Sequence, residues 1–510
     1  MGLCRLSLGR GLLLLWACYC VALCRSMPLA PNAGVGRGWG QEGQGQGQGQ
    51  GQPAAAVRRV RGQPIDFGPL DAQIEAYIAQ RQVAGPAFSI ALVAGGAPVL
   101  SRGYGTHTRR RTPSSPPPEK TTADTLYHMA SISKTFTALA MMQLVEAGRC
   151  SLNDTLSSHL PQLQLHDPRF RKILLWHVLT HTSGLPDVDD YEFYSTPNCT
   201  EPGGALDAYI RQLSDMKAMQ DEELLDKGKM LSEPGEEYRY SNLGFDILAA
   251  VITRLSGEPD YATYVRKHIL SPLGMANTRS VVGDADAALL APPHVLSTWD
   301  PATSTPIAPV MAPDHIYPDN CVHAASSDIT SSAADMMLYV LMQLQHGARP
   351  GGGPRLLEEA TWQAMMRQRV STDDDDPDPS EEYQTTVGIS WFGGTFEGYQ
   401  TLSHDGEDDG FLTQMVLVEE CGAAVVWMSN GDDEAVANED AVELGLQNIT
   451  HAALRLVVGG CGCARALEAA CGAERGDVFA CADCAGAHQQ ALRDAGCGND
   501  AIAAFCSSTR

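Results

Sequence analysis

A serine and a lysine three residues apart, Ser131 and Lys134, are the residues of this sequence best suited to nucleophilic chemistry. They stand in the apolar stretch Met129–Gly148, whose apolar residues recur at helical spacing and whose final glycine can end a helix. Positions i and i+3 share one helix face, so the amine can reach the hydroxyl. The first helical turn also offers free N–H groups to a developing negative charge. The pair predicts a serine nucleophile with a built-in base.

The same pattern occurs a second time, at Ser214 and Lys217. That copy lies in the polar stretch Leu206–Lys229, which contains many acidic residues and is followed by no buried helix. We interpret it as a solvated helix face. The short pattern is therefore weak by itself, and Ser131 needs partners from other parts of the chain.

Two later segments supply polar residues at the ends of predicted elements. Tyr240 and Asn242 follow a Pro-Gly turn and precede a second apolar helix. His404 and Gly406 stand at the end of a predicted strand, where the glycine would let a backbone N–H approach a substrate closely. Taken singly, the tyrosine and the histidine are ordinary packing or surface residues. Their value depends on whether the fold brings them to Ser131.

Strands are predicted near both ends of the catalytic region and helices between them. The sequence after a short helix at Leu70–Gln82 predicts a hairpin that turns at Gly95-Gly96. The expected strands are Phe88–Val93, Pro98–Gly103, Thr385–Phe392, Thr401–His404, Phe411–Glu419 and Ala423–Ser429. The expected later helices are Lys172–Thr180, Ala205–Met219, Asn242–Leu255, Tyr261–Ile269 and Ser332–His346. This order favours an α/β (α+β) fold: one antiparallel sheet built from both ends, flanked by helices, with an inserted all-helical lobe.

Together the motifs Ser131-x-x-Lys134, Tyr240-x-Asn242 and His404-x-Gly406 resemble those of the serine β-lactamase and penicillin-binding-protein superfamily, in its class C-like branch. Trp176–Pro186, Pro234–Gly257 and Leu270–Thr278 are also similar to segments of that family. The resemblance covers roughly Ile65–Asn448, with the three motifs in the family's order. It implies the β-lactamase/transpeptidase-like fold and a secreted, metal-independent serine hydrolase that works through an acyl-enzyme.

The resemblance also implies roles for the individual residues. Ser131 would be the acylated nucleophile, and Lys134 and Tyr240 would share the proton handling, with the first base left open. Asn242 would hold the substrate amide or the lysine. The backbone N–H groups of Ser131 and Glu407 would form the oxyanion hole. His404 takes the place that a lysine often holds in the family.

The third motif departs from the family pattern. Family members that bind β-lactams usually have Thr or Ser where Asp405 stands, and Asp405, Glu407, Asp408 and Asp409 make this segment acidic. Asp405 would repel a substrate carboxylate at 4 Å by about 1–4 kcal/mol. We therefore expect a neutral or cationic ester or amide, which includes small molecules and peptides. The alternatives are a D-alanyl-D-alanine carboxypeptidase or β-lactamase, and a non-catalytic binding protein that retains the fold.

Other potential catalytic patterns carry little weight. His181, in the segment Thr180–Gly184, belongs to a turn common to the family, and a structural role is expected for it. No metal-binding or nucleotide-binding pattern occurs in the catalytic region, so no cofactor is expected.

The chain is expected to have four parts. Residues 1–30 resemble a secretory signal peptide, with an uncleaved membrane anchor as the alternative. Residues 31–63 are rich in Gly, Gln and Arg and predict a disordered linker. Residues 64–455 form the hydrolase domain, and residues 456–510 form a Cys-rich C-terminal module. No later segment is apolar enough to span a membrane, and the sequence leaves the oligomeric state open.

Cysteines and charge bear on compartment and partners. The C-terminal module has seven cysteines, for which disulfides are favoured over a zinc site. The zinc ligands would be Cys461, Cys463, Cys481, Cys484 and His488. Glycosylation sequons occur at Asn153, Asn198 and Asn448, so we expect a secreted protein or one in the lumen of the secretory pathway. The formal net charge of −25 argues against nucleic-acid partners, which require clustered Lys and Arg.

Overall fold

The structure, a computed structural model, divides into the compact units Met1–Ala56 and Val57–Arg510. It describes residues 59–60, 63–80, 87–107, 119–165, 167–187, 210, 230–280, 290–291, 295–300, 305–312, 322–372, 383–408, 410–431, 439–459, 461–474, 478–494, 502 and 505–506. The expected signal peptide, the second Ser-x-x-Lys copy and the helix at Ala205–Met219, apart from Ile210, lie outside these residues. The signal peptide and the four-part division therefore stay predictions.

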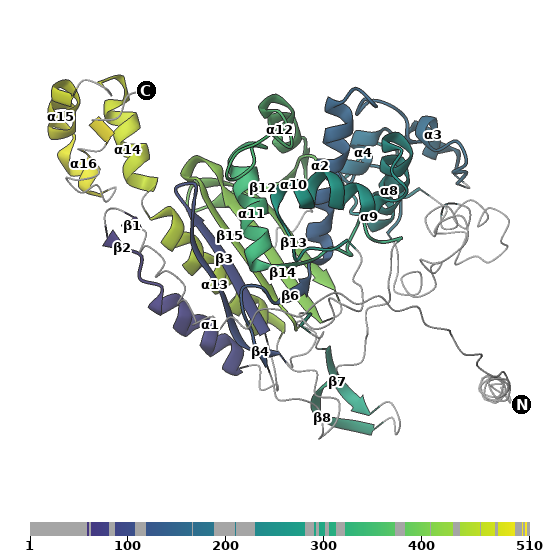
Figure 1. Ribbon diagram of the computed structural model, residues 1–510, viewed down its shortest axis with the longest axis horizontal. Helices are drawn as coiled ribbons and strands as arrows, with labels where there is room; N and C mark the ends of the chain where they lie inside the picture. Colours follow the sequence, from purple (N-terminus) through teal and green to yellow (C-terminus); the bar gives the residue numbers. More distant parts are fainter. Residues whose placement is uncertain are drawn as a thin grey trace, which may run out of the picture. The chain divides into compact units, whose positions relative to one another are not determined.

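A large antiparallel sheet organises the second unit (Figure 1). Within the described residues it has nine strands in the order β10-β11-β12-β13-β14-β15-β3-β4-β5. The early strands are β3 (Ala87–Ala94), β4 (Ala97–His107) and β5 (Glu119–Lys120). The late ones are β10 (Val370–Ser371), β11 (Thr386–Val387), β12 (Phe392–Phe396), β13 (Tyr399–Asp408), β14 (Phe411–Val418) and β15 (Ala423–Ser429). The pairing of β15 with β3 joins the two ends of the catalytic region, which confirms the expected sheet.

The hairpin of β3 and β4 forms where the glycine pair predicts it. Gly95 and Gly96 have φ angles of 56° and 71°, a conformation that side chains with a Cβ atom disfavour. Along β3 the side chains alternate between the sheet faces, with Phe88, Ile90 and Leu92 in one core and Ala91 and Val93 in the other. The sheet is therefore buried on both faces.

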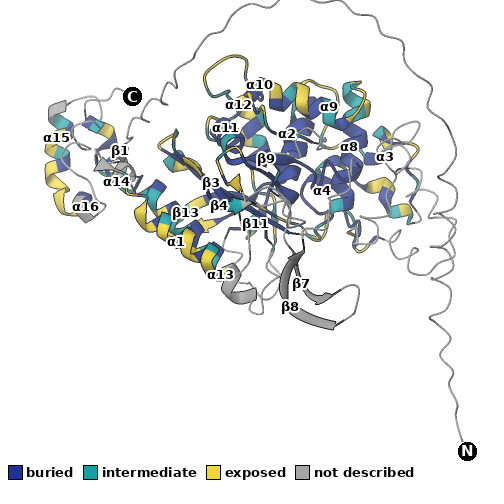
Figure 2. Ribbon diagram, turned by 60° about the horizontal axis from the view of Figure 1, so that its bottom comes forward, coloured by how far each residue is buried: buried dark blue, intermediate teal, exposed yellow. Residues whose placement is uncertain are grey.

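Helices cover both faces of the sheet (Figures 1 and 2). On one face α1 (Gly68–Gln80) and α13 (Glu439–Val458) pack through residues such as Ile74 and Ile449. The other face carries the helical lobe, whose central helix, α2 (Ser133–Glu146), is buried along most of its length. A short 3₁₀ turn, η1 (Ala130–Ile132), leads into α2, and Gly148 ends it with a φ of 67°.

The remaining elements surround α2 or connect the lobe to the sheet. The helices are α3 (Leu156–His159), α4 (Leu175–Leu179), α8 (Asn242–Ser256), α9 (Tyr261–Val265), α10 (Ser271–Leu273), α11 (Ala333–Leu344) and α12 (Glu359–Met366). Shorter helical turns are η2 (Pro168–Lys172), η4 (Arg266–Leu270) and η7 (Glu419–Cys421). Small two-stranded sheets pair β1 (Arg59–Val60) with β2 (Gln63–Pro64), β6 (Leu126–His128) with β9 (Thr330–Ser332), and β7 (Val295–Asp300) with β8 (Thr305–Ala312).

One expected strand is wrong. The stretch Thr385–Phe392 is not a single strand, because β11 ends at Val387 and β12 begins at Phe392. Between them Gly388 donates a backbone hydrogen bond to the carbonyl of Trp391, and Ser390 has a φ of 63°. Consecutive apolar residues made this tight connection resemble a buried strand.

The C-terminal cysteines form disulfides. Cys421 pairs with Cys461, Cys471 with Cys484, and Cys481 with Cys506. The last two bonds join α14 (Cys461–Cys471), α15 (Val478–Ala487) and the final residues, while η8 (Gly472–Glu474) and α16 (Gln489–Asp494) complete the helical part. The alternative zinc site is wrong for Cys461, Cys481 and Cys484, because all three sulfurs are used in disulfides. Helix α13 runs to Val458, so the expected boundary between the hydrolase domain and the C-terminal module, at residues 455 and 456, falls inside a helix.

No helix among the described residues is long and apolar enough to cross a bilayer.

Candidate active site

Three separate segments of the chain supply the predicted site residues. Ser131 lies in the 3₁₀ turn before α2 and Lys134 in the first turn of α2. Asn242 is the first residue of α8, with Tyr240 two residues before it. The segment from His404 to Glu407 belongs to β13. Helix α2 packs against α8, and η1 contacts β13.

The Lys134 amine is held by three oxygen atoms. Its Nζ lies 2.9 Å from Ser131 Oγ, 2.5 Å from Asn242 Oδ1 and 2.9 Å from the backbone oxygen of Ser326. The lysine is fully buried, and this burial lowers its pKa to about 8. Nearby carboxylates oppose the shift without cancelling it: Asp187, Asp246, Asp408 and Asp405. A deprotonated amine is therefore accessible near neutral pH.

The Tyr240 hydroxyl donates a hydrogen bond of 2.7 Å to Ser131 Oγ. Burial raises the pKa of Tyr240 well above 10, although the bond to Ser131 acts in the opposite direction. Tyr240 is therefore a neutral phenol at physiological pH, able to donate a proton. The serine oxygen thus contacts a lysine and a tyrosine at the same time.

Asn242 is oriented by Asp187, a residue that the sequence analysis did not identify. Asp187 accepts hydrogen bonds from the backbone N–H of Asn242 at 2.7 Å and from its Nδ2 at 3.2 Å. With the amide nitrogen engaged, the amide oxygen faces Lys134. The sequence held no signal for Asp187, because it lies more than 50 positions from each of the three motifs and belongs to no pattern with them.

His181 supports Tyr240 rather than Ser131. The two rings stack with centroids 4.2 Å apart and planes at 16°. His181 Nδ1 accepts the backbone N–H of Ser241 at 3.1 Å, and burial keeps its pKa well below 6.5. The imidazole is therefore neutral, in agreement with the structural role expected for it.

Strand β13 approaches Ser131 closely at Gly406. A Cβ atom on Gly406 would lie 2.4 Å from the backbone oxygen of Met129 and 3.0 Å from the nitrogen of Ser131. Thr413 on β14 donates to the same Met129 oxygen at 3.0 Å. Only glycine fits here without moving backbone atoms. The glycine thus brings the next residue, Glu407, to the edge of the site.

The side chains on either side of Gly406 differ in exposure. His404 is 1% exposed, its Nδ1 lies 2.7 Å from the backbone oxygen of Asp405, and burial lowers its pKa to about 3. It is therefore an uncharged imidazole at the position where a lysine is often found. The Asp405 side chain is 53% exposed, and Glu407 is also exposed. Negative charge therefore lies on the accessible side of this strand.

Ala130, directly before the nucleophile, has a φ of 45° although it is not a glycine. Such a conformation costs of order 1–3 kcal/mol and needs support from the surrounding structure. The support here is complete burial of both Ala130 and Ile132. The kink sets the direction in which the serine enters the helix. No sequence signal indicated it.

The whole catalytic region matches a known family. The family model described as Beta-lactamase matches residues 70–448. The chain belongs to the beta-lactamase family.

Two curated relatives match a shorter part. The chain is 31% identical over 196 residues to Protein flp of Staphylococcus aureus (strain MW2), which covers 38% of this chain and 34% of the relative. It is 32% identical over 180 residues to Penicillin-binding protein 4* of Bacillus subtilis (strain 168), covering 35% of this chain and 34% of the relative. The chain thus spans about a third of the length of these curated relatives.

Solved structures share the fold. A penicillin-binding protein homologue from Pyrococcus abyssi superposes with a TM-score of 0.57 at 22% identity, covering 79% of this chain and 81% of that chain. D-amino acid amidase from Ochrobactrum anthropi SV3 gives a TM-score of 0.56 at 20% identity, covering 76% and 99%. The class C beta lactamase from Rhodobacter sphaeroides gives 0.52 at 19% identity, covering 75% and 99%. These likenesses confirm the expected α/β fold.

Proposed function

We propose that this protein is a serine hydrolase that cleaves esters or amides through an acyl-enzyme on Ser131. The observation that carries the proposal is that Ser131 Oγ lies within hydrogen-bond distance of both Lys134 Nζ and Tyr240 OH. A nucleophile with a base and a second proton-transfer group is the arrangement that covalent catalysis requires.

Lys134 is proposed as the first base. Asn242 Oδ1 and the oxygen of Ser326 can only accept hydrogen bonds, so they take two N–H bonds of the amine. In the neutral amine the remaining position is a lone pair, and the third contact of Nζ is Ser131 Oγ. The lone pair can therefore receive the serine proton. Tyr240, with its high pKa, remains a donor to the serine oxygen.

The reaction then has two halves. Lys134 takes the proton of Ser131 as Oγ attacks the substrate carbonyl carbon, and the proposed N–H groups of Ser131 and Glu407 stabilise the oxyanion. The bond to the leaving group breaks, and a proton from the Lys134–Tyr240 pair passes to that group. In the second half a water attacks the acyl carbon and gives a proton to the same pair. The bond to Ser131 Oγ then breaks, the pair returns the proton to Oγ, and the acid leaves.

The proposed substrates are neutral or cationic next to the scissile bond. His404 is neutral and buried, while Asp405 is half-exposed and negative. The D-amino acid amidase that shares this fold was crystallised with L-phenylalanine amide and with L-phenylalanine, both of which carry a free amine. A small amide or ester with a nearby ammonium group is the substrate class we propose on these grounds.

The test of the function uses two probes on the full chain and on Ser131→Ala. A fluorophosphonate labels an activated serine, and a fluorescent penicillin tests recognition of an anionic β-lactam. We expect labelling of the wild-type chain by the fluorophosphonate alone, and no labelling of Ser131→Ala. Labelling by the penicillin as well would favour the carboxypeptidase or β-lactamase alternative. An unlabelled wild-type chain would contradict hydrolase activity and favour the binding-protein alternative.

The charge preference has its own prediction. Replacing Asp405 with threonine removes a negative charge from the accessible side of β13, so the ratio of kcat/KM for anionic over cationic aryl amides should rise about tenfold. Glu397→Gln is the matched control, because Glu397 is an exposed acid paired with Arg455 on the surface. An unchanged ratio in Asp405→Thr would contradict the proposed role of this carboxylate.

We also propose that the protein passes through an oxidising compartment. Support comes from the three described disulfides and from the exposure of Asn153 and Asn448, two of the glycosylation sequons. Expression of the full chain in a eukaryotic host, followed by enzymatic deglycosylation and N-terminal sequencing, tests this. A glycan-free, cytosolic product that begins at Met1 would contradict it.

A further inference from the structure

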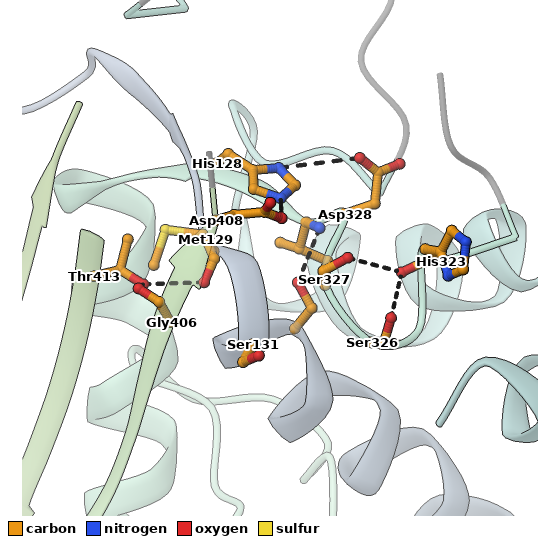
Figure 3. A network of polar contacts seen from close by, with 12 residues as sticks. His128, Met129, Ser131, His323, Ser326, Ser327, Asp328, Gly406, Asp408 and Thr413 are labelled. Atoms are coloured by element: carbon orange, nitrogen blue, oxygen red, sulfur yellow. Dashed lines mark hydrogen bonds and ion pairs between the residues drawn. The ribbon is translucent and has the colours of Figure 1, made fainter. Parts of the chain in front are cut away.

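Three ionisable side chains beside Ser131 form a cluster that the mechanism above does not use (Figure 3). His128 Nε2 lies 3.0 Å from Asp408 Oδ2, and His128 Nδ1 lies 4.0 Å from Asp328 Oδ1. The exposed fractions of these side chains are 4% for His128, 17% for Asp408 and 8% for Asp328. The imidazole therefore lies between two largely buried carboxylates and presents one ring nitrogen to each.

Each of the three residues belongs to a segment that supplies part of the proposed machinery. His128 ends β6, three residues before Ser131. Asp408 ends β13, directly after Glu407. Asp328 lies in the turn whose Ser326 oxygen accepts a hydrogen bond from Lys134. The cluster thus joins the nucleophile segment, the proposed oxyanion strand and the lysine support.

The cluster matters most for Glu407, because it completes the anchoring of β13 on both sides of that residue. On one side Gly406 packs against Met129, and Thr413 donates to the Met129 oxygen. On the other side Asp408 is bound to His128. Since His128 and Met129 are consecutive, both anchors connect β13 to the same short segment that leads into Ser131. The Glu407 backbone between them has little freedom to move away from the serine.

We propose that His128 is a positioning residue for the oxyanion hole: by binding Asp408 it holds the Glu407 N–H in register with the Ser131 N–H. The inference rests on the proposed function, since the oxyanion hole is part of it. His128 does not touch the reacting atoms. Its effect should therefore fall on stabilisation of the tetrahedral state and leave substrate binding and the Lys134 base unchanged.

The experiment compares His128→Ala, His128→Gln and a matched control in the full chain. Glutamine places an N–H donor near the position of Nε2 and can keep the bond to Asp408. The control is His159→Ala, because His159 forms a similar 3.0 Å pair with Asp154 away from the site. Each protein is assayed for kcat, KM and the pH profile on a neutral aryl ester. The inhibition constant of phenylboronic acid, whose adduct with a serine is tetrahedral and anionic, is measured as well.

For His128→Ala we expect kcat to fall and the phenylboronic acid inhibition constant to rise, each at least about tenfold. KM should stay within about threefold of the wild-type value, and the midpoint of the profile of kcat against pH should not move. His128→Gln should recover most of the loss, and His159→Ala should behave as wild type. If His128→Ala does not fold, Asp408→Ala, which removes the other half of the pair at a strand end, should give the same losses in kcat and in boronate inhibition. Its pH midpoint should move to lower pH, because Asp408 is one of the carboxylates that raise the pKa of Lys134.

The inference is overturned if the folded His128→Ala or Asp408→Ala protein keeps wild-type kcat and boronate inhibition. A shift of the pH midpoint with unchanged boronate inhibition also overturns it, because that would assign His128 to proton transfer. A wild-type chain that is inert toward both the ester and the fluorophosphonate is a different result. It would refute the hydrolase proposal itself, and the positioning role with it.

Discussion

The side chain of Lys134 illustrates, at the scale of a single residue, how folding can prepare a base. A lysine in water holds its proton until well above pH 9. Complete burial lowers the pKa of Lys134 to about 8. The three oxygen contacts hold the amine so that it keeps a place for the serine proton. Below pH 8 the folded chain buries a protonated amine, and this burial lowers the free energy of unfolding relative to a chain with a neutral side chain at this position.

The first prediction concerns the rate of serine acylation against pH. Because the neutral amine is the proposed base, fluorophosphonate labelling of Ser131 should speed up about tenfold per pH unit below 8 and level off above it. Tyr240 adds no second step in this range, because its pKa lies well above 10. Labelling rates between pH 6 and 9.5 test this. A rate that is constant from pH 6.5 to 9 would exclude Lys134 as the base.

The second prediction concerns stability against pH in Lys134→Met. The pKa of Lys134 is lower in the folded chain than in the unfolded chain, so between pH 8 and 10.5 only the unfolded chain holds the proton. Wild-type stability should therefore rise across this window, relative to Lys134→Met, by about 3 kcal/mol. Urea unfolding of both proteins at pH 7, 8, 9 and 10 measures the difference. A difference independent of pH would mean that the lysine is not buried as described.

At the scale of elements, the site depends on the contact between η1 and β13. The contact is possible because β13 has no side chain at Gly406, and because Ala130 turns the chain so that Ser131 faces the strand. The ladder between β13 and β14 uses only the backbone of Gly406, which pairs with Thr413, and needs no particular side chain there. The close approach is therefore a property of the site.

The third prediction tests this contact with Gly406→Ala. The new Cβ would lie 2.4 Å from the Met129 oxygen and 2.5 Å from Thr413 Oγ1, so the strand has to move away from Ser131. Fluorophosphonate labelling should fall by at least about 100-fold, the range lost when one oxyanion donor is removed. Gly393→Ala on β12 is the control, because the atoms nearest its Cβ would belong to the side chains of Gln368 and Thr386 and not to backbone. Equal labelling of both variants would contradict the role of the glycine.

At the scale of the whole chain, the Cys421–Cys461 disulfide connects the catalytic sheet to the C-terminal helices. Cys421 lies in the turn between β14 and β15, and Cys461 begins α14, 40 residues later. The other two described disulfides lie within the C-terminal part, which has a small core of its own around Leu467, Cys471 and Leu492. The catalytic sheet is thus linked covalently to a part that does not contribute to the site.

The fourth prediction is that replacing both Cys421 and Cys461 with serine lowers the free energy of unfolding. Closing a loop of this length removes conformational entropy from the unfolded chain, which gives a loss of about 2–4 kcal/mol. Labelling of Ser131 at 20 °C should not change, because the bond lies outside the site. Urea unfolding of the two proteins measures the first effect. Loss of labelling in a folded variant would instead indicate that the C-terminal part supports the active site.

Local patterns determined the elements and the candidate residues. The apolar periodicity of α2 and α8, the glycine pair of the β3–β4 hairpin and the short apolar runs of the late strands are all features of near neighbours in sequence. The Ser131–Lys134 pair is also local, since the two residues are one helical turn apart. The misassigned strand at Thr385–Phe392 shows the limit, because a tight turn inside an apolar run has no pattern of its own.

Contacts between distant segments were decided only by the tertiary structure. Four hydrogen bonds join residues more than 100 positions apart. They are Tyr240 to Ser131, Lys134 to Asn242, Lys134 to the carbonyl of Ser326, and His128 to Asp408. Such contacts depend on how whole helices and strands pack, and packing is not encoded in any short window of sequence. The sequence by itself therefore determined which groups could do the chemistry, and the packing of α8 and β13 against η1 decided which of them meet.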